Sequence, residues 1–525
     1  MRIAVATLLA AIVAAGLRWG TFAVGGSDSY CYVHQAQGWS TGRLQVIEPL
    51  ALDAPWPDAL RTFAPAGHVP SPTVAGAAVP MCPAGLSIAM APFMLIDDFL
   101  ARRSSQSEGG RRPDAIFLVV PLFGALLVWS VYVLGSRFAR RVGLASALLV
   151  ACSPAFLFQL VQPMSDVPAA ALWVLALACA TSSRPHAPAM AGFATSAAIL
   201  MRPNLLPLGV VLGLFILTRP QRTMRERMRG AALFAAASAP GCLAVAMIQQ
   251  SLYGSPLRSG YGSLDTLFST ANIAPNAARY FQWLWQSHTP VWLLALAAPF
   301  VLPGWLTGLL LTFAIVNAAC YLPYVVFNDW WYLRFMLPAI AVLLVLTAAT
   351  IDSIAARALW ARDIRSSRTH RVRAALSSVL TVAMCFLFIR EARARSVFDL
   401  QRLESRYGRA GEYVARRLPE NALIITSWES GSVRFYSHRK TLVWDALDPA
   451  WLDRAIAYSR TRGLEPYLLF ERWEEPLFRQ RFAGSRVAAL DWPPAAEIAG
   501  QVRIYRPEDR ERYLKGEGTP TEYSR

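Results

Sequence analysis

Charged residues are scarce in this 525-residue chain, making up 16% of it, whereas apolar residues make up 55%. A water-soluble domain carries about 25% charged residues, because its surface must be hydrated. The shortage excludes an ordinary soluble protein. Together with a mean hydropathy of +0.34, it indicates that lipid solvates much of the chain.

Acidic residues are the scarcer of the two charge types, with 34 Asp and Glu against 51 Lys and Arg, for a net charge of +17. Such an excess is compatible with nucleic-acid binding, but the arginines gather in short clusters between apolar stretches. That distribution is typical of the cytoplasmic loops of membrane proteins. We therefore predict a membrane protein with no nucleic-acid partner.

Several familiar motifs are missing, among them GxxxxGK[ST], HExxH and the glycine-rich dinucleotide loop. The six His and seven Cys residues show no metal-ligand spacing, which argues against a dedicated zinc site. Only Cys31 and Cys82 share one predicted outer loop, while the other cysteines lie in apolar segments. The sequence leaves a disulfide and two free thiols equally open for this pair.

Long apolar segments predict an all-α membrane bundle of about eleven spanning helices, because roughly 20 apolar residues in a helix cross a bilayer. The segment PMCPAGLSIAMAPFMLI, residues 80–96, is short and interrupted by proline, so we expect it to lie flat at the membrane surface. The predicted spans are residues 3–24, 115–136, 142–160, 167–182, 187–201, 204–218, 230–249, 290–303, 305–326, 332–356 and 374–390.

With that segment lying flat, the main basic connectors fall on one face of the membrane, as the positive-inside rule requires. We predict that residues 1–390 form the transmembrane domain, with an outer loop over 25–113. Residues 391–525 alternate amphipathic segments with four short β-prone runs, NALIIT, TLVWD, PYLLF and VRIYR. This pattern predicts a small α/β domain outside the cytoplasm.

Asp28 follows the first predicted span and lies among aromatic residues, including Tyr30 and Tyr32. A carboxylate at the membrane surface is well placed to deprotonate a hydroxyl brought to a lipid-borne substrate. The competing interpretation is structural, because Ser-Asp-Ser is also good chemistry for capping the next helix.

A second acid and two cations are expected at the same depth. Asp166 ends the motif PMSD, Arg202 divides two short apolar segments, and Arg334 begins another. An intramembrane arginine is costly unless it meets an anion, and a phosphate fits its guanidinium well. Phosphate binding, snorkelling, and pairing with Asp166 or Asp329 remain open.

In their order along the chain, these residues resemble the GT-C superfamily of membrane glycosyltransferases, especially bacterial relatives of protein O-mannosyltransferases and aminoarabinose transferases. Many relatives carry a second acid directly after the first, where this chain has Ser29. The resemblance rests on Asp28, PAGLSIAMAPF, PMSD, the RPN at Arg202, LYGSPLRSGYG from Leu252 and YLRFMLP from Tyr332.

The resemblance implies an inverting transferase that takes a sugar from a polyprenyl-phosphate donor at the periplasmic face of the bacterial inner membrane. Asp28 would be the general base, and Arg202 and Arg334 would stabilise the departing phosphate. The acceptor would be a glycan, a lipid or a protein, and a divalent cation is left open. The remaining predicted substrate-binding residues are Asp166, Tyr30, Tyr32 and Tyr261.

Two other classes of protein stay open. A transporter or flippase is suggested by Arg202, because the proline-flanked segments around it have the pattern of a broken helix. A non-catalytic scaffold that binds a partner through its C-terminal domain is the third alternative.

Overall fold

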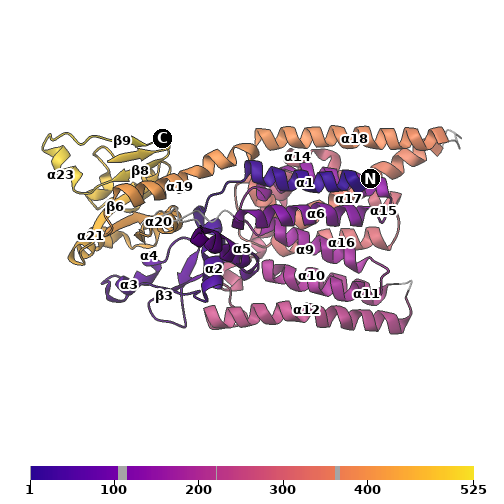
Figure 1. Ribbon diagram of the computed structural model, residues 1–525, viewed down its shortest axis with the longest axis horizontal. Coiled ribbons are helices and arrows are strands. Elements are labelled where there is room, and N and C mark those ends of the chain that lie inside the picture. Colours follow the sequence, from indigo (N-terminus) through magenta and orange to yellow (C-terminus); the bar gives the residue numbers. More distant parts are fainter. Residues whose placement is uncertain (1, 104–114, 220–221, 361–366, 525) are drawn as a thin grey trace.

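The computed structural model describes residues 2–103, 115–219, 222–360 and 367–524. The end of the predicted outer loop, at residue 113, therefore lies outside the described residues. Long helices run side by side in a bundle, and a domain containing a β-sheet lies at one end of it (Figure 1). Helices α12 and α18 form opposite edges of the bundle in this view.

Every segment predicted to span the membrane contains a helix. The bundle elements are α1 (Arg2–Trp19), η1 (Ala115–Leu118), α6 (Val119–Gly135), α7 (Arg140–Cys152), α8 (Pro154–Leu160), α9 (Asp166–Ala180), α10 (Ala187–Met201), η2 (Pro203–Leu205), α11 (Leu206–Thr218), α12 (Met224–Tyr253), η4 (Pro290–Ala297), α15 (Ala298–Val301), α16 (Trp305–Tyr321), η5 (Trp330–Met336), α17 (Leu337–Trp360) and α18 (Ser367–Ala394).

Among the described residues, four helices are long and apolar enough to cross a membrane, or five if the bent pair α7 and α8 is one span. That pair bends by 61° where Pro154 starts the second helix, because proline lacks the N–H that would continue the first. The other predicted spans coincide with apolar helices of 10–17 residues. The count of about eleven crossings stays a prediction.

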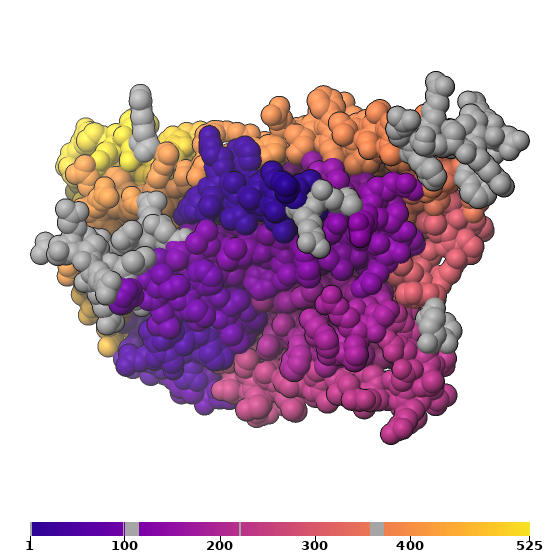
Figure 2. Space-filling model, turned by 45° about the vertical axis from the view of Figure 1, so that its right-hand side comes forward, coloured from indigo at the N-terminus to yellow at the C-terminus, as the bar shows by residue number. Residues whose placement is uncertain are grey.

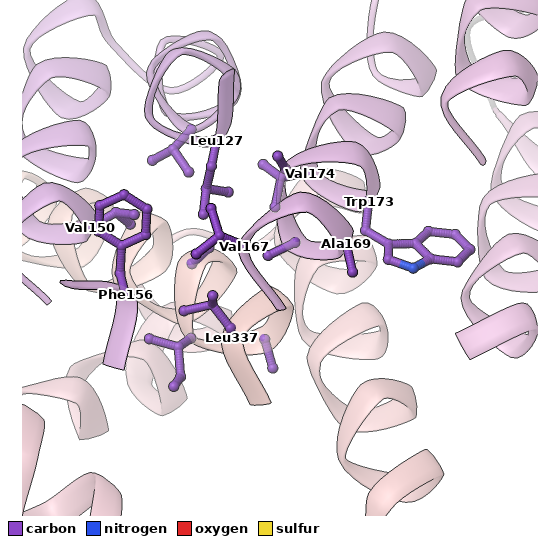
Figure 3. Close-up of a cluster of buried hydrophobic side chains, with 14 of the residues drawn as sticks. Leu127, Val150, Phe156, Val167, Ala169, Trp173, Val174 and Leu337 are labelled. Carbon is purple, nitrogen blue, oxygen red and sulfur yellow. The ribbon is translucent and has the colours of Figure 1, made fainter. Parts of the chain in front are cut away.

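The bundle core is formed by aliphatic and aromatic side chains from α6 to α9 and from α17 (Figure 3). Trp173 on α9 is completely buried and is the largest side chain in this core. Helix α9 is apolar on nearly all sides, as expected for a helix surrounded by others. The labelled residues of the cluster are Leu127, Val150, Phe156, Val167, Ala169, Trp173, Val174 and Leu337.

The basic connectors meet at one end of the bundle. Arg137, after α6, donates a hydrogen bond to the carbonyl of Ala178 near the end of α9. Arg219, after α11, donates to the carbonyl of Ser182 in the next connector. The N-terminus, the end of α17 and the start of α18 lie at this same end, opposite the C-terminal domain (Figure 1).

At the other end, the segments between α1 and α6 form a compact layer. Strands β1, β3 and β2 pair antiparallel in a small sheet that the sequence did not predict. Helix α5 lies beside α2 at this end of the bundle (Figure 1), and Cys31 and Cys82 form a disulfide. The elements are α2 (Gly26–Thr41), β1 (Val46–Ile47), α3 (Pro49–Asp53), α4 (Ala59–Phe63), β2 (His68–Pro70), β3 (Ala77–Pro80) and α5 (Ala84–Arg103).

Three further helical segments, α13 (Leu264–Leu267), η3 (Thr270–Asn272) and α14 (Ile273–His288), connect α12 to η4. The loop before them packs tightly on the outer layer. A Cβ atom on Gly260 would lie 2.3 Å from the Cα of Met81, so only glycine fits there. This close approach explains the second of the three glycines in the motif LYGSPLRSGYG.

The C-terminal region forms a six-stranded mixed sheet in the order β5-β4-β6-β8-β7-β9. The four predicted β-prone runs correspond to β4, β5, β6 and β8, and apolar side chains cover both faces of the sheet. The elements are η6 (Val397–Asp399), α19 (Leu400–Arg417), β4 (Ala422–Thr426), α20 (Ser430–Ser437), β5 (Lys440–Val443), η7 (Trp444–Ala446), η8 (Pro449–Trp451), α21 (Leu452–Thr461), β6 (Glu465–Glu471), α22 (Glu474–Arg481), η9 (Val487–Ala489), β7 (Ala496–Ile498), β8 (Val502–Tyr505), α23 (Asp509–Leu514) and β9 (Glu522–Ser524).

Candidate active site

Asp28 lies in the first turn of α2, where the chain has just left α1. The N-cap of α2 is Gly25, so Asp28 does not have the capping role that its Ser-Asp-Ser context suggested. Its Oδ2 accepts a hydrogen bond of 2.9 Å from Nη2 of Arg334. The Asp28 side chain remains 35% exposed, which leaves part of the carboxylate accessible to a bound molecule.

Asp166 is the first residue of α9, and its side chain is completely buried. Its Oδ1 accepts a hydrogen bond of 2.7 Å from Nη2 of Arg202. The same oxygen lies 4.0 Å from Nε of Arg334. The two acids and two arginines therefore form one chain of alternating charge, in the order Asp28, Arg334, Asp166, Arg202.

Arg202 occupies the break between α10 and η2, where its backbone is extended. Its Nη1 donates a hydrogen bond of 3.1 Å to the hydroxyl of Tyr321. Helix α5 begins directly against this break, since a Cβ on Gly85 would lie 2.5 Å from the backbone of Leu200 and Met201. The glycine of the PAG motif thus allows the outer layer to touch the segment that carries Arg202.

Aromatic rings support both arginines. The guanidinium carbons of Arg202 and Arg334 lie 5.3 and 5.2 Å from the ring centre of Phe335, and Arg334 also lies 5.1 Å from that of Tyr332. Cation–π contacts of this kind stabilise a cation that has left water. Sequence reasoning missed Tyr321 and Phe335, whose only signal was the aromatic density between residues 321 and 335, and such density is common where helices leave a membrane.

Tyr32 and Tyr261 lie beside this chain of charges. The hydroxyls of Tyr32 and Ser165 form a hydrogen bond of 2.8 Å, which ties α2 to the residue preceding Asp166. Burial raises the pKa of both tyrosines, and the negative charge of Asp28 raises it further. The structure therefore brings both predicted tyrosines next to the acids.

Tyr30 is not part of this group. It is 2% exposed and stacks on His34, facing α20 of the C-terminal domain, where a Cβ on Gly431 would lie 2.4 Å from its ring. Residues two apart on a helix point to nearly opposite sides, so Asp28 and Tyr30 cannot share a face of α2. Tyr30 thus packs against the C-terminal domain, and its role in substrate binding stays a prediction.

The C-terminal domain holds the segment that precedes Asp28. The N–H of Val24 donates a hydrogen bond of 2.9 Å to the hydroxyl of Tyr436 in α20. Gly25 touches the ring of Tyr407, since a Cβ there would lie 2.0 Å from a ring carbon. Tyr407 in turn accepts a hydrogen bond from the indole N–H of Trp428. The C-terminal domain thus fixes the start of α2.

The described residues do not offer a metal site. No group of three or more His, Cys, Asp or Glu side chains among them could hold a metal ion. Both acids of the charge chain already accept from arginines, and Ser29 contacts the sulfur of Met164 at 3.8 Å. No chemical step is therefore assigned to a divalent cation.

Comparison with known proteins places this geometry in context. A family model described as dolichyl-phosphate-mannose-protein mannosyltransferase matches residues 108–247, which include Asp166 and Arg202. The crystal structure of ArnT from Cupriavidus metallidurans bound to undecaprenyl phosphate aligns with a TM-score of 0.56. The alignment covers 95% of this chain and 97% of ArnT, at 12% sequence identity.

The chain has the fold of the GT-C superfamily of membrane glycosyltransferases. This confirms the resemblance identified from the sequence. The oligosaccharyltransferase of Archaeoglobus fulgidus is also similar, with a TM-score of 0.50, 11% identity, and coverage of 89% of this chain and 68% of that one.

Arabinofuranosyltransferase AftD from Mycobacteria is a further structural neighbour, with a TM-score of 0.51 and 12% identity. This chain aligns over 90% of its own length but only 37% of AftD. No curated protein matches the chain at a significant level. At these identities the GT-C likeness describes the fold, and the chemistry must be argued from the charge chain.

Proposed function

We propose that this protein is an inverting glycosyltransferase that moves a sugar from a polyprenyl-phosphate donor to an acceptor at the periplasmic face of a bacterial inner membrane. The observation that carries the proposal is the chain of Asp28, Arg334, Asp166 and Arg202 at the end of the bundle away from the basic connectors. The GT-C fold and the undecaprenyl phosphate bound by ArnT support the same donor class.

In the proposed reaction, Asp28 accepts the proton of the acceptor hydroxyl. The acceptor oxygen forms a bond to the anomeric carbon while the bond from that carbon to the phosphate oxygen breaks. The electron pair leaves with the polyprenyl phosphate, and the configuration at the anomeric carbon inverts. Phosphate is a good leaving group, so one base with cationic stabilisation is sufficient and a second carboxylic acid is not needed.

Arg334 has the contacts expected of the residue that meets the donor phosphate. It pairs with the partly exposed Asp28, whereas Arg202 pairs with the fully buried Asp166 and with Tyr321. Within the described residues, the buried Nε atoms of Arg334 and Arg202 both lack a hydrogen bond, so the partly exposed partner, Asp28, is what distinguishes Arg334. A phosphate that binds Arg334 would compete with Asp28 and release its carboxylate to act as the base.

The decisive experiment replaces Asp28 by Asn in purified protein assayed with a polyprenyl-phosphate sugar. We expect transfer to fall by at least about 100-fold, because a general base contributes roughly 10² to 10⁴ in rate. The control is Asp265→Asn, which removes an exposed acid from α13 and should leave turnover unchanged. Near-normal transfer by the Asp28→Asn variant would refute the assignment.

The same preparation tests the transport alternative. Proteoliposomes that contain the protein but no sugar donor should not accumulate a lipid-linked or anionic substrate. If the proteoliposomes accumulate substrate under these conditions, and the Asp28→Asn variant accumulates it equally well, the protein is a transporter rather than a transferase. Mass analysis of envelope glycans and lipids from a deletion strain then identifies the sugar that is lost and the acceptor that carried it.

A further inference from the structure

A second polar recess lies at the end of the bundle opposite the candidate active site. It has a volume of about 130 Å³ and lies where the connector between α9 and α10 meets the end of α11 and the start of α12. These helix ends are at the right of Figure 1. Its charged lining residues are Arg184, Arg219, Arg222, Glu226, Arg227 and Arg229.

Positive charge in this recess is not balanced by the protein. Five arginines face one glutamate, which gives a net charge of +4. The glutamate, Glu226, is already occupied, because it accepts hydrogen bonds from Arg222 and from the backbone of Thr223 at the start of α12. Beyond Glu226, the lining residues include no acid that would balance the remaining arginines.

Two of the arginines are fixed by the backbone, which makes the recess a built feature. Arg219 donates to the carbonyls of Ala180, Thr181 and Ser182, and Arg222 donates to that of Ser183. These carbonyls follow the C-terminus of α9, where the helix leaves them without partners. Burial and the neighbouring Arg222 and Arg137 lower the pKa of Arg219, as expected for a cation among other cations.

Two other arginines remain available to a ligand. Arg184 and Arg229 are exposed, and within the described part of the chain their side chains make no hydrogen bond or ion pair. They come from the two sides of the recess, one from the α9–α10 connector and one from α12. A phosphate group between them would have donors on both sides.

Part of the recess lining is apolar. It is formed by Pro188, Ile216 and Leu233, and Gly230 allows α12 to pack closely there, since a Cβ would lie 3.2 Å from Ile216. Leu233 itself is 37% exposed on the outer side of the bundle. A cationic rim beside an apolar lining matches a phosphate headgroup that continues into acyl chains, whereas free phosphate would use the rim alone.

We propose that this recess binds the headgroup of an anionic phospholipid. The recess is separate from the candidate active site, so this proposal does not depend on the proposed glycosyltransferase activity. Basic connectors on the cytoplasmic side are a general feature of membrane proteins, so the test must separate this recess from the average positive field.

The experiment is native mass spectrometry of the full-length protein after exchange into phosphatidylglycerol or phosphatidylcholine. The double variant Arg184→Gln/Arg229→Gln should lower the phosphatidylglycerol-bound fraction about tenfold or more, because two cationic contacts are lost. The matched control, Arg140→Gln/Arg225→Gln, removes two exposed arginines that do not line the recess. The control should bind phosphatidylglycerol like the unmodified protein.

Three results would overturn the proposal. If both double variants lost phosphatidylglycerol to the same extent, binding would come from the overall positive charge of the basic connectors and not from this recess. If the unmodified protein retained phosphatidylcholine as well as phosphatidylglycerol, the charge of the headgroup would not determine binding. Displacement of phosphatidylglycerol by an equal concentration of inorganic phosphate would identify a free-anion site.

Discussion

At the scale of single residues, the two ion pairs of the candidate active site differ in burial. The side chains of Asp166 and Arg202 are 0% and 13% exposed, whereas Asp28 is 35% exposed. A buried pair is expensive to break, because the remaining charge stays in a poorly solvating environment. The pair of Asp166 and Arg202 therefore holds the site together, and the pair of Asp28 and Arg334 is the one that can open.

This difference predicts opposite behaviour for two carboxamide variants. Asp166→Asn should lower the free energy of unfolding by about 3–5 kcal/mol, since Arg202 loses its buried partner. Asp28→Asn should lower stability less, because Asp28 is partly solvated and Arg334 keeps the Asp166 carboxylate 4.0 Å from its Nε. Thermal unfolding of detergent-purified protein, followed by fluorescence-detected size exclusion, measures both. If Asp166→Asn lowered the stability less than Asp28→Asn, the pair of Asp28 and Arg334 would be the one that holds the site together.

At the scale of elements, the position of α2 depends on the C-terminal domain. Gly25→Ala should collide with the ring of Tyr407 and displace the start of α2, which carries Asp28. We expect turnover to fall by about tenfold or more, since a displacement near 1 Å at a reacting group can reduce rate by about 100-fold.

The control for this variant is Gly308→Ala in α16, where an added Cβ meets no atom within 4 Å and the backbone is helical. The control should insert and turn over normally. If Gly25→Ala retained full activity, the C-terminal domain would not be needed to position the helix that carries Asp28.

A second prediction at this scale concerns the pH dependence of the C-terminal domain. Burial, followed by repulsion from Glu471, raises the pKa of Glu429 to about 8, and burial raises that of Glu474 to about 7. An unfolded chain loses these protons near pH 4.5. Between that pH and 8 the folded protein keeps protons that the unfolded chain has lost, so stability should fall as pH rises across this interval.

Glu429→Gln should reduce the loss of stability between pH 4.5 and pH 8 and raise the unfolding temperature at pH 8. Differential scanning fluorimetry of the full-length protein between pH 5 and pH 8.5 measures it, and each pKa unit corresponds to about 1.4 kcal/mol. Glu420→Gln, at an exposed site of the same domain, is the control. An unchanged slope in Glu429→Gln would assign the pH dependence to other groups.

At the scale of the whole molecule, the two ends of the bundle differ in charge and in chemistry. Arginines of several connectors gather at one end, and the charge chain, the Cys31–Cys82 disulfide and the C-terminal domain lie at the other. Figure 2 shows the N-terminal segment, in indigo, at the surface of one face, with purple segments below it and orange segments above it. A disulfide is favoured in an oxidising compartment, which supports a periplasmic position for that end.

Reporter fusions test this orientation. Alkaline phosphatase, which is active only after export, should be active when fused after the C-terminal domain and inactive when fused in the connector between α11 and α12. The positive-inside rule gives the physical reason, because arginine-rich connectors are retained in the cytoplasm. If alkaline phosphatase fused in the α11–α12 connector were active, the orientation in the membrane would be the reverse of the predicted one.

The sequence by itself determined the apolar helices, the four β-prone runs that became β4, β5, β6 and β8, and the acids and arginines worth testing. These are local properties, because helix length in lipid and strand patterning are read from neighbouring residues. It also named four charged residues that the fold brings together, although their pairing was left open.

Only the tertiary structure decided which charges meet. Asp28 and Arg334 are 306 residues apart, and no local pattern could select Asp166 rather than Asp329 as the partner of Arg202. The same holds for Tyr30, which its position in α2 turns away from Asp28 and towards α20. Contacts between distant segments depend on how helices pack, and packing is a property of the whole chain rather than of any stretch of it.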